Sequence, residues 1–323
     1  MQNDDTARNA TIPRNATIKK SDRGCGFESL PTVNAMPLIK KILYPVAFSP
    51  ACVAMAAYVR RAAAIYHAQV TLLHVVDPAS HSGFELYSRS PFEISEEHVT
   101  LGRERLSAFL AAQFSIDAYE RIVTAGDAAT EIAKTAREGR FDLIVMPTHT
   151  GFFRRMLLGS TTAKVLDDAD CPVLTSTHAE TITPRPLDHR EWLCAMDLSP
   201  NAERMLRFAS QGAAEANSRL SILYAIQGGD PELAVQLDLR EQLHQAEKQK
   251  AMERIAEIQR AAGTNVPVRV TIGSVKKALL SMASESDADA IFIGRGPRSG
   301  KYGRLRDLSY TIIRDSPFPV LSF

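Results

Sequence analysis

The chain contains two copies of one unit, and this duplication constrains its fold more than any other feature. The segment KKILYPVAFSP, which begins at Lys40, aligns without a gap with REWLCAMDLSP, which begins at Arg190. The far ends correspond as well, because DLIVMP at Asp142 matches DAIFIG at Asp289, and CPVLTS matches FPVLSF. A repeat of this length predicts two tandem domains rather than a solenoid of short units.

Short apolar runs alternate with helical patterns in each copy. In the first copy, five runs are expected to form buried strands: KILYPVAF, VTLLHVV, RIVTAG, DLIVMP and PVLTS. One helix is expected to open at Ser49-Pro50, with serine as N-cap, and to end near His67. Other helices are expected from about Ile94 to Phe114 and, in the second copy, from about Pro231 to Ala262. This alternation predicts an α/β fold in which helices cover both faces of a parallel sheet.

The same patterns set the predicted domain boundaries. Residues 1–35 are polar, contain the repeated RNATI and are expected to be a disordered tail, which makes Met36 an alternative translation start. Domain 1 is expected over 36–178 and domain 2 over 190–323. Residues 179–189 between them are polar and rich in proline, as is typical of a linker.

Composition and charge exclude several classes of function. The net charge is +1 and the chain has one Trp, so neither nucleic acid nor an anionic membrane is an expected partner. No apolar run approaches the roughly 20 residues of a membrane span, and the N-terminus lacks the apolar core of a signal peptide. The 4 cysteines form no C-x-x-C pair. We therefore expect a cytoplasmic protein with reduced thiols and no metal site.

The stretch LLGSTTAKVL lies between an expected strand and an expected helix, where an α/β protein can hold a phosphate. Gly159 would let the backbone approach a ligand, and the helix N-terminus after it would offer free N–H groups and a positive dipole end. The alternative is an ordinary turn with a serine cap, which stabilises a helix by about 1 kcal/mol. The pattern itself leaves both interpretations open.

Several spaced blocks resemble the universal stress protein family: KKILYPVAFSP, TLLHVVD, AGDAATEIAKTAREGRFDLIVMPTH and LLGST…CPVL. The resemblance extends from about Pro37 to Phe323 and implies two tandem Rossmann-like domains, each with a parallel five-stranded sheet. It also implies a role in stress responses, frequent dimerisation, and binding of ATP or AMP in some members only. In the family dimer the last strands commonly pair, so PVLTS and PVLSF are expected to pair within this chain. A further homodimer and an unidentified protein partner remain open.

The family's nucleotide signature is Gly, two residues, Gly, nine residues, then Gly-Ser or Gly-Thr. The first copy keeps Gly159 and Ser160, but Pro147 and Thr150 stand where the two upstream glycines belong. Gly151 is expected to take over the flexible role of the second glycine. The acidic residue that contacts the nucleoside in binding members is Ala47 here.

The second copy departs from the signature in the opposite way. Asp197 is retained, but the Gly-Ser position reads Arg306-Asp307, and an acidic residue there would repel phosphate. The resemblance therefore favours the first copy as the site for ATP or AMP. The candidate ligand residues are Pro45, Val75, Met146, His149, Thr150, Gly151, Gly159, Ser160, Thr161 and Asp197.

Three functions remain: a nucleotide-binding stress protein, an interaction scaffold of the same fold without nucleotide, and an enzyme. The sequence has neither a G-x-x-x-x-G-K-[ST] loop nor a G-x-S-x-G nucleophile elbow. It also places no paired carboxylates at equivalent strand ends. We therefore expect no catalytic residues and no enzymatic function, and slow ATP hydrolysis is the least favoured alternative.

Overall fold

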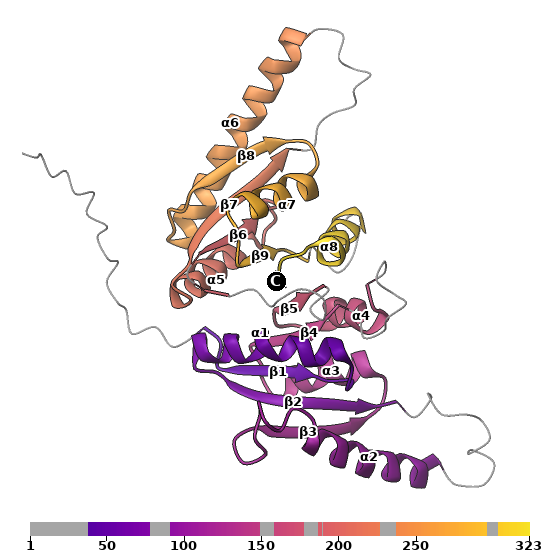
Figure 1. Cartoon of the computed structure of the whole chain (residues 1–323). Coiled ribbons are helices and arrows are strands. Elements are labelled where there is room, and N and C mark those ends of the chain that lie inside the picture. Colours follow the sequence, from indigo (N-terminus) through magenta and orange to yellow (C-terminus); the bar gives the residue numbers. More distant parts are fainter. Residues whose placement is uncertain are drawn as a thin grey trace, which may run out of the picture. The chain divides into compact units, whose positions relative to one another are not determined.

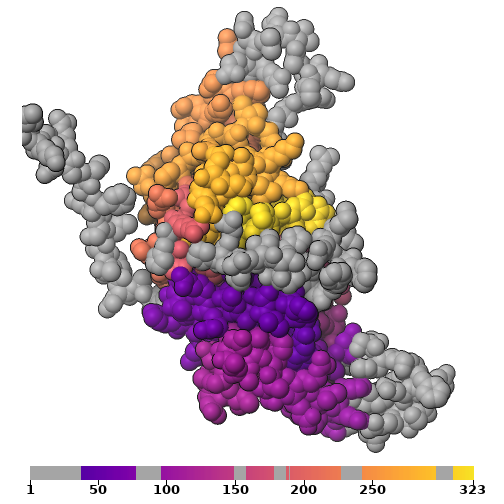
Figure 2. Space-filling model, viewed as in Figure 1, coloured from indigo at the N-terminus to yellow at the C-terminus, as the bar shows by residue number. Residues whose placement is uncertain are grey.

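The computed structural model describes residues 38–77, 91–148, 158–177, 187–188, 190–226, 237–295 and 303–323. The tail expected over 1–35 and most of the expected linker lie outside these residues. Within the described part, Pro37–Phe323 forms one unit by its internal contacts. In the space-filling view, the indigo and purple surface belongs to the first half, and the orange and yellow surface belongs to the second half (Figure 2).

Strands and helices alternate along the described residues of both halves (Figure 1). The strands of the first half are β1 (Lys41–Pro45), β2 (Gln69–Val76), β3 (Glu120–Ala125), β4 (Leu143–Pro147) and β5 (Val173–Ser176). Its helices are α1 (Pro50–Tyr66), α2 (Pro91–Ala108), α3 (Ala128–Glu138) and α4 (Ser160–Asp168). The strands of the second half are β6 (Glu191–Ala195), β7 (Arg219–Ile226), β8 (Val268–Ile272), β9 (Ala290–Ile293) and β10 (Val320–Ser322). Its helices are α5 (Ala202–Glu215), α6 (Leu237–Ala262), α7 (Val275–Glu285) and α8 (Gly303–Asp315).

The strands form one sheet in the order β3-β2-β1-β4-β5-β10-β9-β6-β7-β8. Neighbouring strands are parallel inside each half. At the junction β5 and β10 pair antiparallel, with Leu321 opposite Leu174 and Val320 opposite Thr175. The expected pairing of PVLTS with PVLSF is confirmed, and so is the α/β fold of two tandem five-stranded units.

Side chains on the central strands alternate between two apolar layers, as the pleat of a strand requires. Ile42 and Tyr44 of β1 join one core cluster together with residues of α1, such as Met55. Leu43 joins the other cluster, with residues of α3 and α4 such as Ile132. Both faces of the sheet are therefore covered, and both clusters continue into the second half.

Local sequence signals set the ends of α1. The hydroxyl of Ser49 accepts a hydrogen bond from the backbone N–H of Cys52, and Pro50 is the first helical residue. His67 ends the helix in the left-handed conformation, with φ 52°. The start and the end expected from the sequence are both confirmed.

The helix expected from about Ile94 to Phe114 was placed too late, because α2 runs from Pro91 to Ala108. Leu110 has a φ of 52°, which turns the chain out of the helix. Phe114 lies beyond this turn and is fully buried. The helix expected from about Pro231 begins at Leu237 in the described residues, and the intervening positions lie outside them.

Candidate functional site

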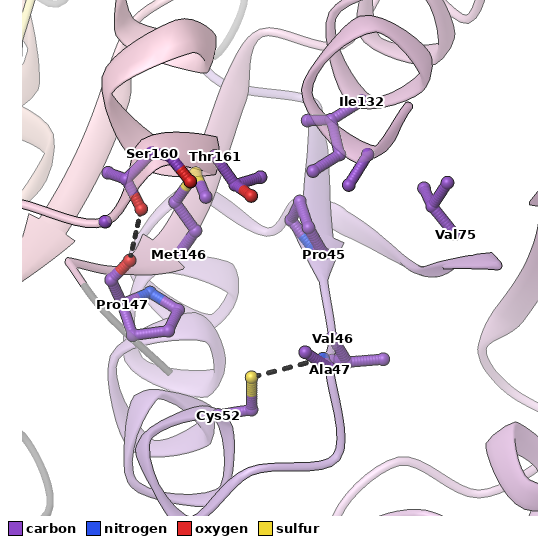
Figure 3. Close-up of a pocket in the computed structure, with 13 residues that line it drawn as sticks. Pro45, Val46, Ala47, Cys52, Val75, Ile132, Met146, Pro147, Ser160 and Thr161 are labelled. Carbon is purple, nitrogen blue, oxygen red and sulfur yellow. Dashed lines mark hydrogen bonds between the residues drawn. The ribbon is translucent and has the colours of Figure 1, made fainter. Parts of the chain in front are cut away.

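A cavity of about 310 Å³ lies at the carboxyl ends of β1 and β4, next to the start of α4 (Figure 3). These neighbouring strands lie where the strand order of the first half changes direction, which is where ligands enter open α/β sheets. The volume falls at the lower end of the range for small-molecule sites. The lining residues are Pro45, Val46, Ala47, Cys52, Val75, Ala128, Ile132, Met146, Pro147, Gly159, Ser160, Thr161 and Thr162.

The first turn of α4 forms the polar wall of the cavity. Gly159 is the N-cap and offers no side-chain acceptor, and Ser160 is the first helical residue. The N–H of Gly159 donates to the carbonyl of Thr148 at 2.8 Å. The amides of the next residues have no acceptor within the helix, because the first turn lacks preceding carbonyls. The interpretation of this turn as a serine cap is therefore wrong, since the capping position holds glycine.

A buried hydroxyl fixes the start of α4 to the end of β4. Thr162 is 3% exposed, and its Oγ1 donates to the carbonyl of Pro147 at 3.0 Å. The second half repeats this contact, because Ser309 in α8 donates to the carbonyl of Gly294 at 2.9 Å. The helix start is thus held against the strand end by the same chemistry in both halves.

Apolar side chains form the opposite part of the wall. Pro45 and Val46 come from the end of β1, Val75 comes from β2, and Ala128 and Ile132 come from α3. In Figure 3, Val75 lies on the other side of the β1 backbone from Ser160. A flat apolar group can contact this surface while an attached anion contacts α4.

The connection from β1 to α1 contributes Ala47 and the thiol of Cys52, in the first turn of α1, to the cavity wall. The N–H of Ala47 donates to Sγ of Cys52 at 3.3 Å (Figure 3), and the hydroxyl of Ser49 donates to the same sulfur at 3.4 Å. The next residue, Phe48, has a φ of 55°, and its counterpart Leu198 has the same value. Both halves therefore have a residue in the left-handed conformation between their first strand and first helix.

One ion pair joins α4 to the residue that caps α3. Nζ of Lys164 lies 3.3 Å from Oδ2 of Asp127, and both side chains are more than half exposed. Hydrogen bonds from the hydroxyl and N–H of Thr130 lower the pKa of Asp127, and Lys164 lowers it further. An exposed pair of this kind contributes little to stability. Its cation, Lys164, belongs to α4.

The structure brings six of the sequence-predicted residues to the cavity: Pro45, Val75, Met146, Gly159, Ser160 and Thr161. His149, Thr150 and Gly151 lie outside the described residues. Asp197, the candidate of the second copy, follows β6 in the other half of the sheet and does not line this cavity. Its Oδ1 accepts a hydrogen bond from the N–H of Ser199 at 3.0 Å, and a Cβ on Gly294 would lie 3.5 Å from its Oδ2.

Sequence reasoning missed Val46, Cys52, Ala128, Ile132 and Thr162. Their positions at the ends of predicted strands and the starts of predicted helices could have identified most of them. Val46 continues β1, Cys52 lies in the first turn of α1, and Ala128 and Ile132 are four residues apart at the start of α3. Such positions meet at the carboxyl edge of a parallel sheet whatever their residue type.

The described residues contain neither a metal cluster nor a membrane-spanning helix. No group of three or more His, Cys, Asp or Glu there could hold a metal ion. No helix in that part of the chain has the length and hydropathy needed to cross a membrane.

Comparisons with known proteins agree on one family. The sequence model of the universal stress protein family matches residues 38–176 and again residues 190–322. A universal stress protein of Methanocaldococcus jannaschii is 33% identical over 146 residues, which cover 44% of this chain and 84% of the relative. Universal stress protein A homolog 2 of Coxiella burnetii is 30% identical over 107 residues, which cover 33% of this chain and 73% of the relative.

One solved structure resembles nearly the whole chain. The crystal structure of a universal stress protein from Archaeoglobus fulgidus superposes with a TM-score of 0.61 and 23% identity. The match covers 89% of this chain and 97% of that chain. At this identity the likeness shows a common fold.

Proposed function

Because the chain belongs to the universal stress protein family, we propose that it is a cytoplasmic, non-enzymatic stress-response protein whose first half binds ATP or AMP. The observation that carries this proposal is the cavity beside α4, which combines an apolar wall with the amides of a helix N-terminus. An adenine nucleotide has the same two parts, a flat base and an anionic phosphate. Conformational change on binding would be read by a protein partner that is not identified.

The proposed orientation follows from the chemistry of the two walls. The phosphate lies against the first turn of α4, where the amides and hydroxyls of Ser160 and Thr161 donate to it. The base lies against Pro45, Val75 and Ile132. Ala47 supplies no carboxylate for the ribose hydroxyls, so the sugar contributes less to affinity than the base and the phosphate.

The lining of the cavity supports a binding role rather than catalysis. Among the described residues, the lining includes no Asp, Glu, His, Lys or Arg, which are the side chains that most often act as general acid or base. Cys52 is the one thiol in this lining, and its sulfur accepts two hydrogen bonds. Slow hydrolysis by a positioned water stays the least favoured alternative.

The first experiment is to denature freshly purified protein and identify released small molecules by mass spectrometry. We expect an adenine nucleotide in near-stoichiometric amount, or, if purification removes it, a thermal shift with millimolar ATP or AMP. Protein that is empty and shows no shift would contradict the proposal. It would favour an interaction scaffold of the same fold.

The substitution Gly159→Val tests where the nucleotide binds. A branched side chain at this cap would occupy the approach of the phosphate to α4, so we expect at least a tenfold loss of affinity by calorimetry. The matched control is Arg306→Val, which places the same side chain at the corresponding position of the second half and should leave affinity unchanged. Equal affinity in both variants would contradict the assignment of the site, provided that circular dichroism shows both to be folded.

A further inference from the structure

Helix α4 connects the cavity of the first half with residues of the second half. It has nine residues, Ser160–Asp168, and is therefore about 13 Å long. Its first turn lines the cavity. Its last turn is contacted by side chains that follow β9 and that belong to α8. A single short helix thus has the proposed ligand at one end and the other half of the chain at its other end.

Arg295, directly after Gly294, binds the carboxyl end of α4. One terminal nitrogen of its guanidinium donates to the carbonyls of Leu166 at 3.0 Å and Ala169 at 2.9 Å. The other terminal nitrogen donates to the carbonyl of Cys171 at 2.8 Å. The last carbonyls of a helix have no partner within it and carry its negative dipole end. A planar cation with several donors suits this position.

Tyr310 of α8 makes a second contact with α4. Its hydroxyl donates to the carboxylate of Asp167, and the same oxygen lies 3.3 Å from the carbonyl oxygen of Ala163. Tyr310 corresponds to Ala163 in the duplication, so the two helices meet at equivalent positions. The middle and the end of α4 are therefore both held by the second half.

The contacts that the second half makes with α4 differ from those that the first half makes with α8. Thr148 occupies the position in the first half that corresponds to Arg295, and its side chain has no fork of donors. In the direction from the first half to α8, the hydroxyl of Thr177 donates to the carbonyl of Ile313 at 2.6 Å. This contact is neutral, whereas Arg295 brings a charge. The half that keeps Gly159 and Ser160 is therefore the one whose helix receives the cationic contact.

We propose that Arg295 is a positioning residue for the ligand site of the first half, and that docking of the second half sets the affinity of this site for the nucleotide phosphate. The inference rests on the proposed function. Fixing the carboxyl end of a nine-residue helix also fixes the direction of the amides at its other end. Donors held in place before binding lose less freedom on binding. Thermodynamic reciprocity then requires the bound nucleotide to tighten the contact between the two halves.

The test compares Arg295→Met and Arg295→Lys with the native protein, using AMP and ATP as probes in calorimetry. We expect both variants to bind about tenfold more weakly, since lysine keeps the charge but cannot reproduce the fork of Arg295. The control is Arg207→Met, in α5 of the same half. Arg207 is exposed and bonds to Glu203 and to the carbonyl of Ala261, so its loss should leave affinity unchanged. Native affinity in Arg295→Met, or full rescue by Arg295→Lys, would overturn the positioning role.

Hydrogen exchange separates this inference from the proposed function. Without nucleotide, Arg295→Met should speed exchange of the α4 amides relative to the native protein and to Arg207→Met. In the native protein, nucleotide should slow exchange in β5 and β10. If the native protein binds no nucleotide, the proposed function fails. In that case the hydrogen exchange of the α4 amides still tests whether Arg295 positions this helix. Exchange in Arg295→Met that equals exchange in the native protein would overturn the positioning role.

Discussion

Asp289 is a buried carboxylate whose pKa differs strongly from its usual value. It is 1% exposed, and its Oδ2 accepts a hydrogen bond from the N–H of Arg190 at 2.9 Å. Its other oxygen lies 3.9 Å from Nε of Arg190. Burial raises the pKa of Asp289 to about 6, and the carboxylates of Asp188 and Asp287 also raise it, against the lowering effect of Arg190. Between about pH 4 and about pH 6, the folded protein therefore binds more of a proton at this carboxyl than the unfolded chain does.

This raised pKa predicts a pH dependence of stability with a definite sign. Between the unfolded pKa, about 4, and the folded pKa of about 6, the folded state binds more protons, so this group makes stability fall as pH rises. Asp289→Asn removes the titration and keeps an oxygen that can accept from Arg190. The free energy of unfolding of the native protein minus that of the variant should therefore decrease from pH 4 to pH 7 in urea titrations. A difference that stays constant or increases would contradict the raised pKa.

At single residues, the sequence indicated the polar wall of the cavity better than the apolar wall. Gly159 and Ser160 stand out because a glycine followed by hydroxyl residues at a helix start is typical of a turn that holds an anion. Ile132 and Ala128 look like ordinary core residues of a helix, and only the meeting of three elements makes them line a cavity. Asp197 was a candidate of the second copy, and it lies after β6, away from this cavity.

At the scale of elements, the carboxyl end of α2 depends on one arginine from β3. The guanidinium of Arg121 donates to the carbonyls of Leu106, at 2.9 Å, and of Phe109 and Phe114. It thus joins the helix to the turn that follows it. Burial lowers the pKa of Arg121, although it stays far above the physiological range for a guanidinium.

Replacing this arginine should destabilise the first half. Arg121→Met leaves several carbonyls without their charged donor, so we expect a loss of about 1.5–3 kcal/mol in the free energy of unfolding, measured with urea. The control is Arg105→Met, in which the lost contact is a guanidinium 4.4 Å from the ring of Phe48. That variant should lose less than about 1 kcal/mol. A smaller effect for Arg121→Met than for Arg105→Met would contradict the capping role.

The strands were easier to predict than the ends of the helices. Each buried strand is a short apolar run between polar residues, and this pattern depends on burial alone. The end of α2 depends on the left-handed Leu110 and on Arg121, which is eleven residues further along the chain. No pattern inside residues 94–114 reports a contact with a later strand.

At the scale of the whole unit, the two halves share their apolar layers. One core cluster contains Ile42 and Val145 of the first half together with Trp192 and Phe292 of the second. The other contains Ile144 together with Ile291. Arg61 of α1 also forms an ion pair with Asp188, which precedes β6. Unfolding one half would expose apolar surface of the other.

Shared layers predict that both halves unfold in one transition. Trp192 is the single Trp of the chain and lies in β6, with its ring 4.9 Å from that of Phe292. Its fluorescence reports the packing between the two halves, because its side chain lies in the core cluster that also contains Ile42 and Val145. Far-ultraviolet circular dichroism reports the helices of both halves. The two urea curves should coincide, as expected for a two-state transition. Separate midpoints would show that the halves unfold independently.

The antiparallel pairing of β5 with β10 within one chain does not depend on how abundant the protein is. When two separate subunits pair through such strands, dilution releases them, because their association depends on concentration. Here both strands belong to one chain, so each has its partner present at a fixed effective concentration. A cell that contains a few copies of this protein would keep the strands paired as completely as a cell that contains thousands.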